Sequence, residues 1–135
     1  MASIPLTPPA NALTPNRVAV LIGFGLVLWA AGVVMLRWLA DAGAMTGAWL
    51  PLVYAAVIPL TLPCIPLGPR LARLPASETA RCTALVCATA VTIDGLVIGF
   101  VPWVYAADAD LARAVAGCLL WAIGVALILG LIRRG

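Results

Sequence analysis

Four long apolar stretches alternate with short polar segments along the chain. They cover residues 18–40, 48–67, 80–104 and 111–132. Each is close to the roughly 20 residues that an α-helix needs to cross a ~30 Å hydrocarbon layer. The pattern therefore predicts an all-α, polytopic membrane protein with four transmembrane helices in an up-down bundle. The lipid bilayer is its first expected partner.

The stretch before the first apolar segment has a different character. Residues 1–16 contain four prolines and no charged side chain. They lack the charged start and the small-residue cleavage pattern of a signal peptide. We expect residues 1–16 to form a flexible, proline-rich tail and residues 17–135 to form the transmembrane domain.

The arginines are distributed unevenly between the two ends of the predicted bundle. Six of them flank the tail, the middle loop and the C-terminus: Arg17, Arg70, Arg73, Arg81, Arg133 and Arg134. Short loops rich in arginine stay in the cytoplasm, so both termini are predicted on the cytoplasmic side of a bacterial inner membrane. At the opposite boundary we expect a belt of aromatic side chains, made of Trp38, Trp49, Trp103 and Tyr105.

Prolines interrupt the second predicted helix. Pro59, Pro63 and Pro66 each lack the N–H group that would bond to the carbonyl four residues earlier. We predict a kink or break, with Thr61, Cys64, a water or a neighbouring helix satisfying the freed carbonyls. One interpretation is a tolerated kink. The other is a broken helix that lines a polar cavity, as in transporters.

Composition narrows the chemistry. Hydrophobic residues make up 64% of the chain and charged residues only 10%, which excludes an ordinary soluble domain. The scattered arginines form no nucleic-acid-binding face. The chain has no histidine, and its four cysteines, Cys64, Cys82, Cys87 and Cys118, form no C-x-x-C pair. We expect no metal, no cofactor and no enzymatic activity.

Asp94 is the exceptional residue, because an ionised carboxylate inside lipid is costly and is therefore a candidate functional group. Counted inward from the outer helix ends, Trp29, Pro59, Asp94 and Trp121 lie nine to eleven residues deep. That depth is roughly 14–17 Å, near the bilayer midplane. Trp29 and Trp121 are therefore candidates to donate a hydrogen bond to Asp94.

Arg37 is a second candidate partner for Asp94. It shares one side of its helix with Gly23 and Ala30, and its side chain leans toward the midplane. Either Arg37 pairs with Asp94 and keeps it ionised, or Arg37 extends to the lipid headgroups and leaves Asp94 to desolvation, which favours the neutral carboxyl.

The helix that carries Asp94 also contains a small-residue pair, Gly95-x-x-x-Gly99. Small residues let transmembrane helices approach closely. We expect Gly95 and Gly99 to pack inside the bundle rather than to form a dimer face.

Two functional hypotheses follow. The first is a non-enzymatic membrane protein that acts through helix packing, as a homo-oligomer or as an accessory component of a membrane complex. The second is a small proton-coupled transporter or channel-like component that uses Asp94.

Several of these features resemble one family. Arg37, the proline-broken second helix, TIDGLVIGFVPWVY in the third helix and LLWAIGVALILGL in the fourth are similar to a four-span bacterial membrane family, domain of unknown function 5367. The resemblance covers about residues 18–132. It implies a four-helix inner-membrane protein with Arg37 and Asp94 at matching positions, and it implies no activity.

Overall fold

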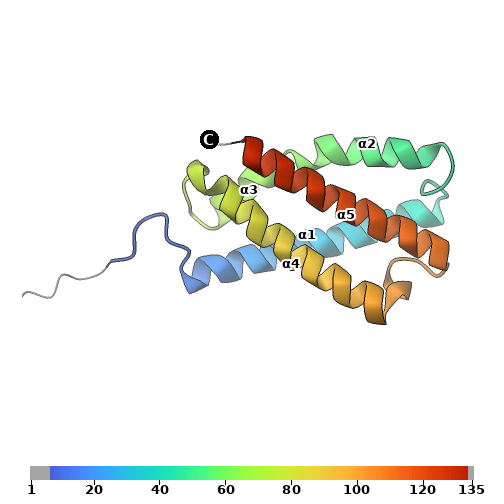
Figure 1. Ribbon diagram of the computed structural model, residues 1–135, viewed down its shortest axis with the longest axis horizontal. Helices are drawn as coiled ribbons and strands as arrows, with labels where there is room; N and C mark the ends of the chain where they lie inside the picture. The colour runs from blue at the N-terminus through green and yellow to red at the C-terminus, as the bar shows by residue number, and fades with distance from the viewer. Residues whose placement is uncertain (1–6, 134–135) are drawn as a thin grey trace, which may run out of the picture.

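The computed structural model describes residues 7–133, and every regular element in that range is helical (Figure 1). Arg134, one of the predicted cytoplasmic arginines, lies outside the described residues. In chain order the elements are α1 Pro15–Asp41, α2 Trp49–Thr61, α3 Cys64–Leu71, the short 3₁₀ helix η1 Ala76–Glu78, α4 Thr79–Phe100, the 3₁₀ turn η2 Pro102–Val104 and α5 Ala109–Ile132.

Four helical stretches are long and apolar enough to cross a membrane: Pro15–Asp41, Trp49–Leu71, Ala76–Phe100 and Ala109–Ile132. The outer surface is apolar as well, with Val34, Phe100 and Ile132 each more than two thirds exposed. Water would not favour such extended apolar surface. The prediction of a helical, multi-pass membrane protein is confirmed at this level.

Side-chain caps start two of the helices earlier than predicted. Thr14 Oγ1 accepts a hydrogen bond from the Arg17 N–H at 3.5 Å, and Pro15 takes the first helical position, which favours proline. Asp108 Oδ1 accepts from the N–H groups of Asp110 and Leu111, both at 3.0 Å. Each cap adds about one turn or less to the predicted helix.

The second apolar stretch forms two helical segments, because α2 ends at Thr61 and α3 begins at Cys64. Thr61 Oγ1 donates to the Val57 carbonyl at 2.7 Å, and Cys64 Sγ donates to the Leu60 carbonyl at 3.7 Å. The expectation that these two side chains satisfy the carbonyls freed by the prolines is wrong. A hydroxyl or thiol in a helix reaches back to the carbonyl four residues before it, so its own position selects its acceptor.

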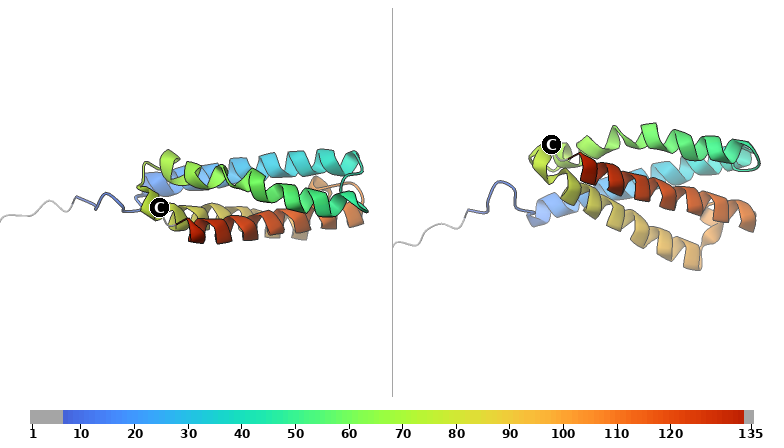
Figure 2. Two further views of the ribbon diagram at one scale, coloured as in Figure 1. Left: turned by 90° about the horizontal axis from the view of Figure 1, so that it is seen from above. Right: turned by 45° about the horizontal axis from the view of Figure 1, so that its top comes forward.

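The helices pack around α4, whose main neighbours are α1 and α5, while α2 packs on α5 and α3 on α4. By contrast, α1 and α2 make little direct contact. Successive long segments run in opposite directions, so α1 begins at the end of the molecule where α5 ends (Figure 1). The view from above places α1 and α3 on one side of α4 and α5, while α2 runs obliquely and approaches α5 near the start of α2 (Figure 2, left).

Two glycines allow the close approach of α1 and α5 to α4. A Cβ on Gly25 would lie 2.9 Å from the Val86 carbonyl oxygen, and a Cβ on Gly130 would lie 2.9 Å from the Thr83 side chain. Nothing lies within 4 Å of a Cβ built on Gly23, Gly95 or Gly99. The glycines that bring the helices together are therefore not the ones singled out from the sequence.

The prediction that Gly95 and Gly99 pack inside the bundle is wrong, because both are exposed. The reason lies in the orientation of α4. At ~100° per residue, Gly95 and Gly99 lie about 100° and 140° around the helix from Asp94, which is buried. Turning Asp94 toward the interior turns this glycine pair outward.

Candidate functional site

Asp94 faces the interior of the bundle. Its side chain is 1% exposed, and it shares a face of α4 with the buried residues Thr83 and Cys87. At ~100° per residue, the three positions lie within about 20° of one direction around the helix. Helix α4 therefore has a polar, buried face within an apolar span.

The two carboxylate oxygens of Asp94 have different surroundings. Oδ1 accepts hydrogen bonds from Trp29 Nε1 at 2.7 Å and from the Tyr105 hydroxyl at 2.5 Å. Oδ2 is buried and has no hydrogen-bond partner among the described residues. A buried polar oxygen without a partner is uncommon in proteins and requires an explanation.

Of the two tryptophans placed at the depth of Asp94, only Trp29 bonds to it. Trp121 Nε1 instead donates to the Tyr54 carbonyl at 3.0 Å, and the two rings lie 5.9 Å apart between centroids. Trp121 thus joins α5 to α2. Pro59, the other residue at that depth, is exposed on α2.

Arg37 does not pair with Asp94, so this alternative is wrong. Its Nη1 donates to the carbonyls of Trp103 and Val104, both at 2.9 Å. The ion pairs in the described part of the chain are Arg81–Glu78 and Arg113–Asp110, both local. The turn after α4 lies within reach of Arg37 and offers two acceptors. Through them Arg37 holds the turn that leads into Tyr105.

Tyr105 is the site residue that sequence reasoning missed. It was expected among the boundary aromatics, but it is fully buried, whereas Trp38, Trp49 and Trp103 are each more than 60% exposed. The cause is Pro102, which disfavours helical geometry at Val101 (φ −140°, ψ 53°) and ends α4 at Phe100 instead of residue 104. The Pro102–Val104 turn then directs Tyr105 back into the bundle. Pro102 was the available signal.

Tyr105 stays a hydrogen-bond donor at neutral pH. Burial raises the pKa of its hydroxyl above the usual value, and the hydrogen bond to Asp94 raises it further. The effect of Trp29 is in the opposite direction and smaller. The hydroxyl therefore keeps the proton that it donates to Asp94 Oδ1.

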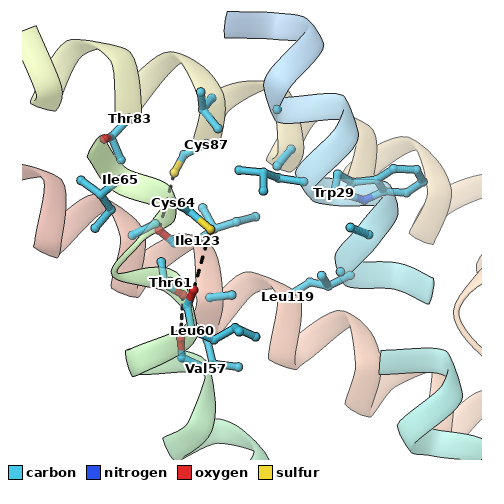
Figure 3. Close-up of a pocket in the computed structure, with 18 of the residues that line it drawn as sticks. Trp29, Val57, Leu60, Thr61, Cys64, Ile65, Thr83, Cys87, Leu119 and Ile123 are labelled. Atoms are coloured by element: carbon cyan, nitrogen blue, oxygen red, sulfur yellow. Dashed lines mark hydrogen bonds between the residues drawn. The ribbon is translucent and has the colours of Figure 1, made fainter. Parts of the chain in front are cut away.

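A cavity of about 410 Å³ lies beside this carboxyl group, with residues of all five α-helices on its wall (Figure 3). Asp94 and Trp29 form part of a wall that is otherwise largely apolar. Its few polar groups include Thr61, Cys64 and Cys87, which donate to the carbonyls of Val57, Leu60 and Ile123. The broken second span does line a cavity, as one interpretation of its prolines held, but this cavity is mainly apolar.

No group of three or more His, Cys, Asp or Glu side chains could hold a metal ion within residues 7–133. The four cysteines are all free thiols. The described residues bring together one carboxyl group, two donors that orient it, and the cavity beside it.

Comparisons of the chain with family models, curated proteins and solved structures find no match. The resemblance to domain of unknown function 5367 stays a prediction.

Proposed function

We propose that this chain is a multi-pass membrane protein in which Asp94 binds and releases a proton within the bilayer, as a small proton-coupled transporter or channel-like component. One observation carries the proposal. Asp94 is buried in a membrane-spanning helix with Oδ1 held by two donors, while Oδ2 on the same carboxyl group has no partner. An intramembrane carboxyl in such surroundings is suited to proton exchange.

The hydrogen bonds fit a carboxyl group that changes its protonation state. An ionised Oδ2 without a donor is costly in a low-dielectric interior, and a proton on Oδ2 removes that cost. Oδ1 accepts from Trp29 and Tyr105 in both states, so the side chain keeps its orientation. A purely structural acid would be expected to use both oxygens.

The same proposal includes an orientation, with both termini in the cytoplasm of a bacterial inner membrane. The start of α1, the end of α3 and the end of α5 lie at one end of the molecule (Figure 1). That end carries Arg17, Arg70, Arg73, Arg81 and Arg133. An excess of arginine in short loops supports a cytoplasmic location for this end.

Proton flux into liposomes tests the function. Wild type, Asp94→Asn and Asp94→Leu would be reconstituted at equal density and followed with a pH-sensitive dye inside the vesicles. We expect a flux in wild type that both variants lose, because neither side chain exchanges a proton. A silent wild type together with an unstable Leu variant would assign Asp94 a structural role instead.

A second candidate function is helix association, as a homo-oligomer or as an accessory component of a membrane complex. The observation that favours it is the outward position of Gly95 and Gly99, which continue a line of exposed small residues from Ala84 and Ala88 on α4. Small residues are typical of transmembrane helix contacts. Gly99→Leu should then lower the oligomer mass in detergent, whereas Gly23→Leu on α1 should not.

A further inference from the structure

We propose that the cavity beside Asp94 binds an apolar amine in its protonated form, and that the ammonium group replaces the proton of Asp94. The inference rests on the proposed function, since both require an Asp94 that gives up its proton. It adds the chemical class of the ligand.

The wall of the cavity selects against most ligands. Among the described residues, no arginine lines it and its only acidic oxygen belongs to Asp94, so an anion finds no positively charged partner there. The hydroxyl of Thr61 and the thiols of Cys64 and Cys87 already donate to backbone carbonyls, so a highly polar molecule would lose hydrogen bonds on entering. The volume of about 410 Å³ is within the usual range for small-molecule sites.

Asp94 supplies the one acidic anchor among the described residues of the wall, where the Thr83 hydroxyl is a further, neutral polar group. Oδ1 has two donors already, and Oδ2 has none among the described residues. An ammonium group brings N–H donors and a positive charge, and a hydrogen bond between two charged groups is about twice as strong as a neutral one. An apolar molecule with a single ammonium group therefore complements both the wall and its anchor.

The exchange balances in protons and charge. The O–H bond of the neutral Asp94 carboxyl breaks, its electron pair stays on the carboxylate, and the proton leaves to water. The bound ammonium then neutralises the carboxylate. One proton is released for each cation bound. The other titratable groups at this site are the Tyr105 hydroxyl and the thiols of Cys64, Cys87 and Cys118 on the cavity wall.

The cavity has a side that faces the surroundings of the bundle. Its wall includes Ala31 and Met35 of α1 and Leu60 of α2, all of them exposed, with Leu60 at 52%. Exposed residues of both α1 and α2 therefore form part of this wall, on the side of the cavity that faces lipid in a membrane. An apolar amine dissolved in the bilayer can enter there without crossing water.

Binding to the protein in lipid nanodiscs tests the inference, with aminoadamantane as the probe and adamantane carboxylate as a ligand with the same apolar body. Equilibrium dialysis would measure binding, and a pH indicator in weak buffer would measure proton release. We expect saturable binding of about one amine per chain, with about one proton released, and no saturable binding of the carboxylate. Asp94→Asn should weaken amine binding at least ~10-fold and abolish the proton release.

A second variant keeps the test valid if Asp94→Asn fails to fold. Ala122→Phe would fill the cavity from α5 and leave Asp94 in place, whereas Ala56→Phe adds the same bulk on an exposed face of α2 that does not line the cavity. We expect Ala122→Phe to lose amine binding and Ala56→Phe to keep it. Equal binding by both variants, or equal binding of the amine and the carboxylate, would overturn the inference.

The two proposals fail separately. Amine binding with proton release in a protein that shows no proton flux would support the binding site and overturn the transport function. Asp94-dependent proton flux without saturable amine binding would overturn the inference and leave the proposed function in place.

Discussion

The hydroxyl of Tyr105 contributes to the stability of the fold although Tyr105 lies next to a loop, because both Tyr105 and Asp94 are buried. Tyr105→Phe removes one donor to Oδ1 and changes little else. We expect it to lower the free energy of unfolding by about 1–3 kcal/mol, as for other buried hydrogen bonds to a polar group. In an Asp94→Leu background the same substitution should cost much less. Denaturant unfolding in micelles would measure this double-mutant cycle, and equal costs in the two backgrounds would show that the bond contributes little.

Alkaline pH should lower the stability that this hydrogen bond contributes. In the unfolded chain the tyrosine hydroxyl ionises near its ordinary pKa of about 10, whereas in the folded protein burial and Asp94 raise the pKa. The stability due to the protonated hydroxyl is therefore fully present below about pH 10 and is lost as the pH rises beyond it. We expect the Tm of wild type to fall more steeply than that of Tyr105→Phe between about pH 10 and pH 12. Equal falls in Tm for wild type and Tyr105→Phe would show that ionisation of Tyr105 does not cause the loss of stability.

Single residues also show where sequence reasoning succeeds. Counting turns placed Trp29 and Asp94 at one depth, and they do bond. The same count placed Trp121 there, yet Trp121 binds the Tyr54 carbonyl, because depth says nothing of direction around the helix axis. Arg37 was correctly placed near the C-terminal end of α1. Its acceptors, however, are the carbonyls of Trp103 and Val104, in a turn that the sequence pattern predicted as helix.

At the level of elements, the contact between α1 and α4 depends on Gly25. Adding a Cβ there would bring it within 2.9 Å of the Val86 carbonyl oxygen, a backbone atom that cannot rotate away. Gly25→Ala should therefore destabilise the protein by about 1–3 kcal/mol, as overpacking does elsewhere. It should also disturb the Trp29–Asp94 bond, one turn further along α1.

Gly23→Ala is the matched control, on the same helix with open space around its Cβ. Alanine is favoured over glycine in a helix by up to about 1 kcal/mol, so this variant should be neutral or slightly more stable. Thermal unfolding of both variants in micelles would measure the difference. A loss of similar size at both positions would indicate that helix propensity and not close packing decides.

Prolines explain which element boundaries were predictable. Pro59, Pro63 and Pro66 drew attention because they gather in one segment, and the second span is divided there. Pro102 stands alone inside an apolar run, VPWVY, that has the hydrophobicity of a helix. The apolar pattern extended the third helix to residue 104, although the proline ends it at Phe100. The length of an apolar run indicates how much of the chain can lie in lipid. It does not indicate the residue at which the backbone can no longer continue as a helix.

At the scale of the whole molecule, the number of spans was predictable because lipid requires long apolar helices. The arrangement of the helices around α4 was not, since apolar residues cover every side of each span and leave no periodic pattern to identify neighbours. The rotation of α4 about its own axis follows from Asp94, the charged residue in the interior of the span, whereas Glu78 and Arg81 lie near the start of the span. The burial of Asp94 turns Gly95 and Gly99 outward, against the expectation from the small-residue pattern alone.

Orientation across the membrane is the prediction that belongs to the complete molecule, because it depends on the charges of all loops together. Ser77 lies between the arginines Arg73 and Arg81, and Thr46 lies in the loop after α1; both side chains are exposed. We expect Thr46→Cys to react with a membrane-impermeant maleimide added outside whole cells with a permeabilised outer membrane, and Ser77→Cys to react only after the inner membrane is disrupted. Wild type supplies the background from the four native thiols, of which three are buried. Labelling of Ser77→Cys in intact cells would contradict the proposed orientation and indicate the opposite one. It would also place the arginine-rich end outside, where the positive-inside tendency of membrane insertion disfavours it.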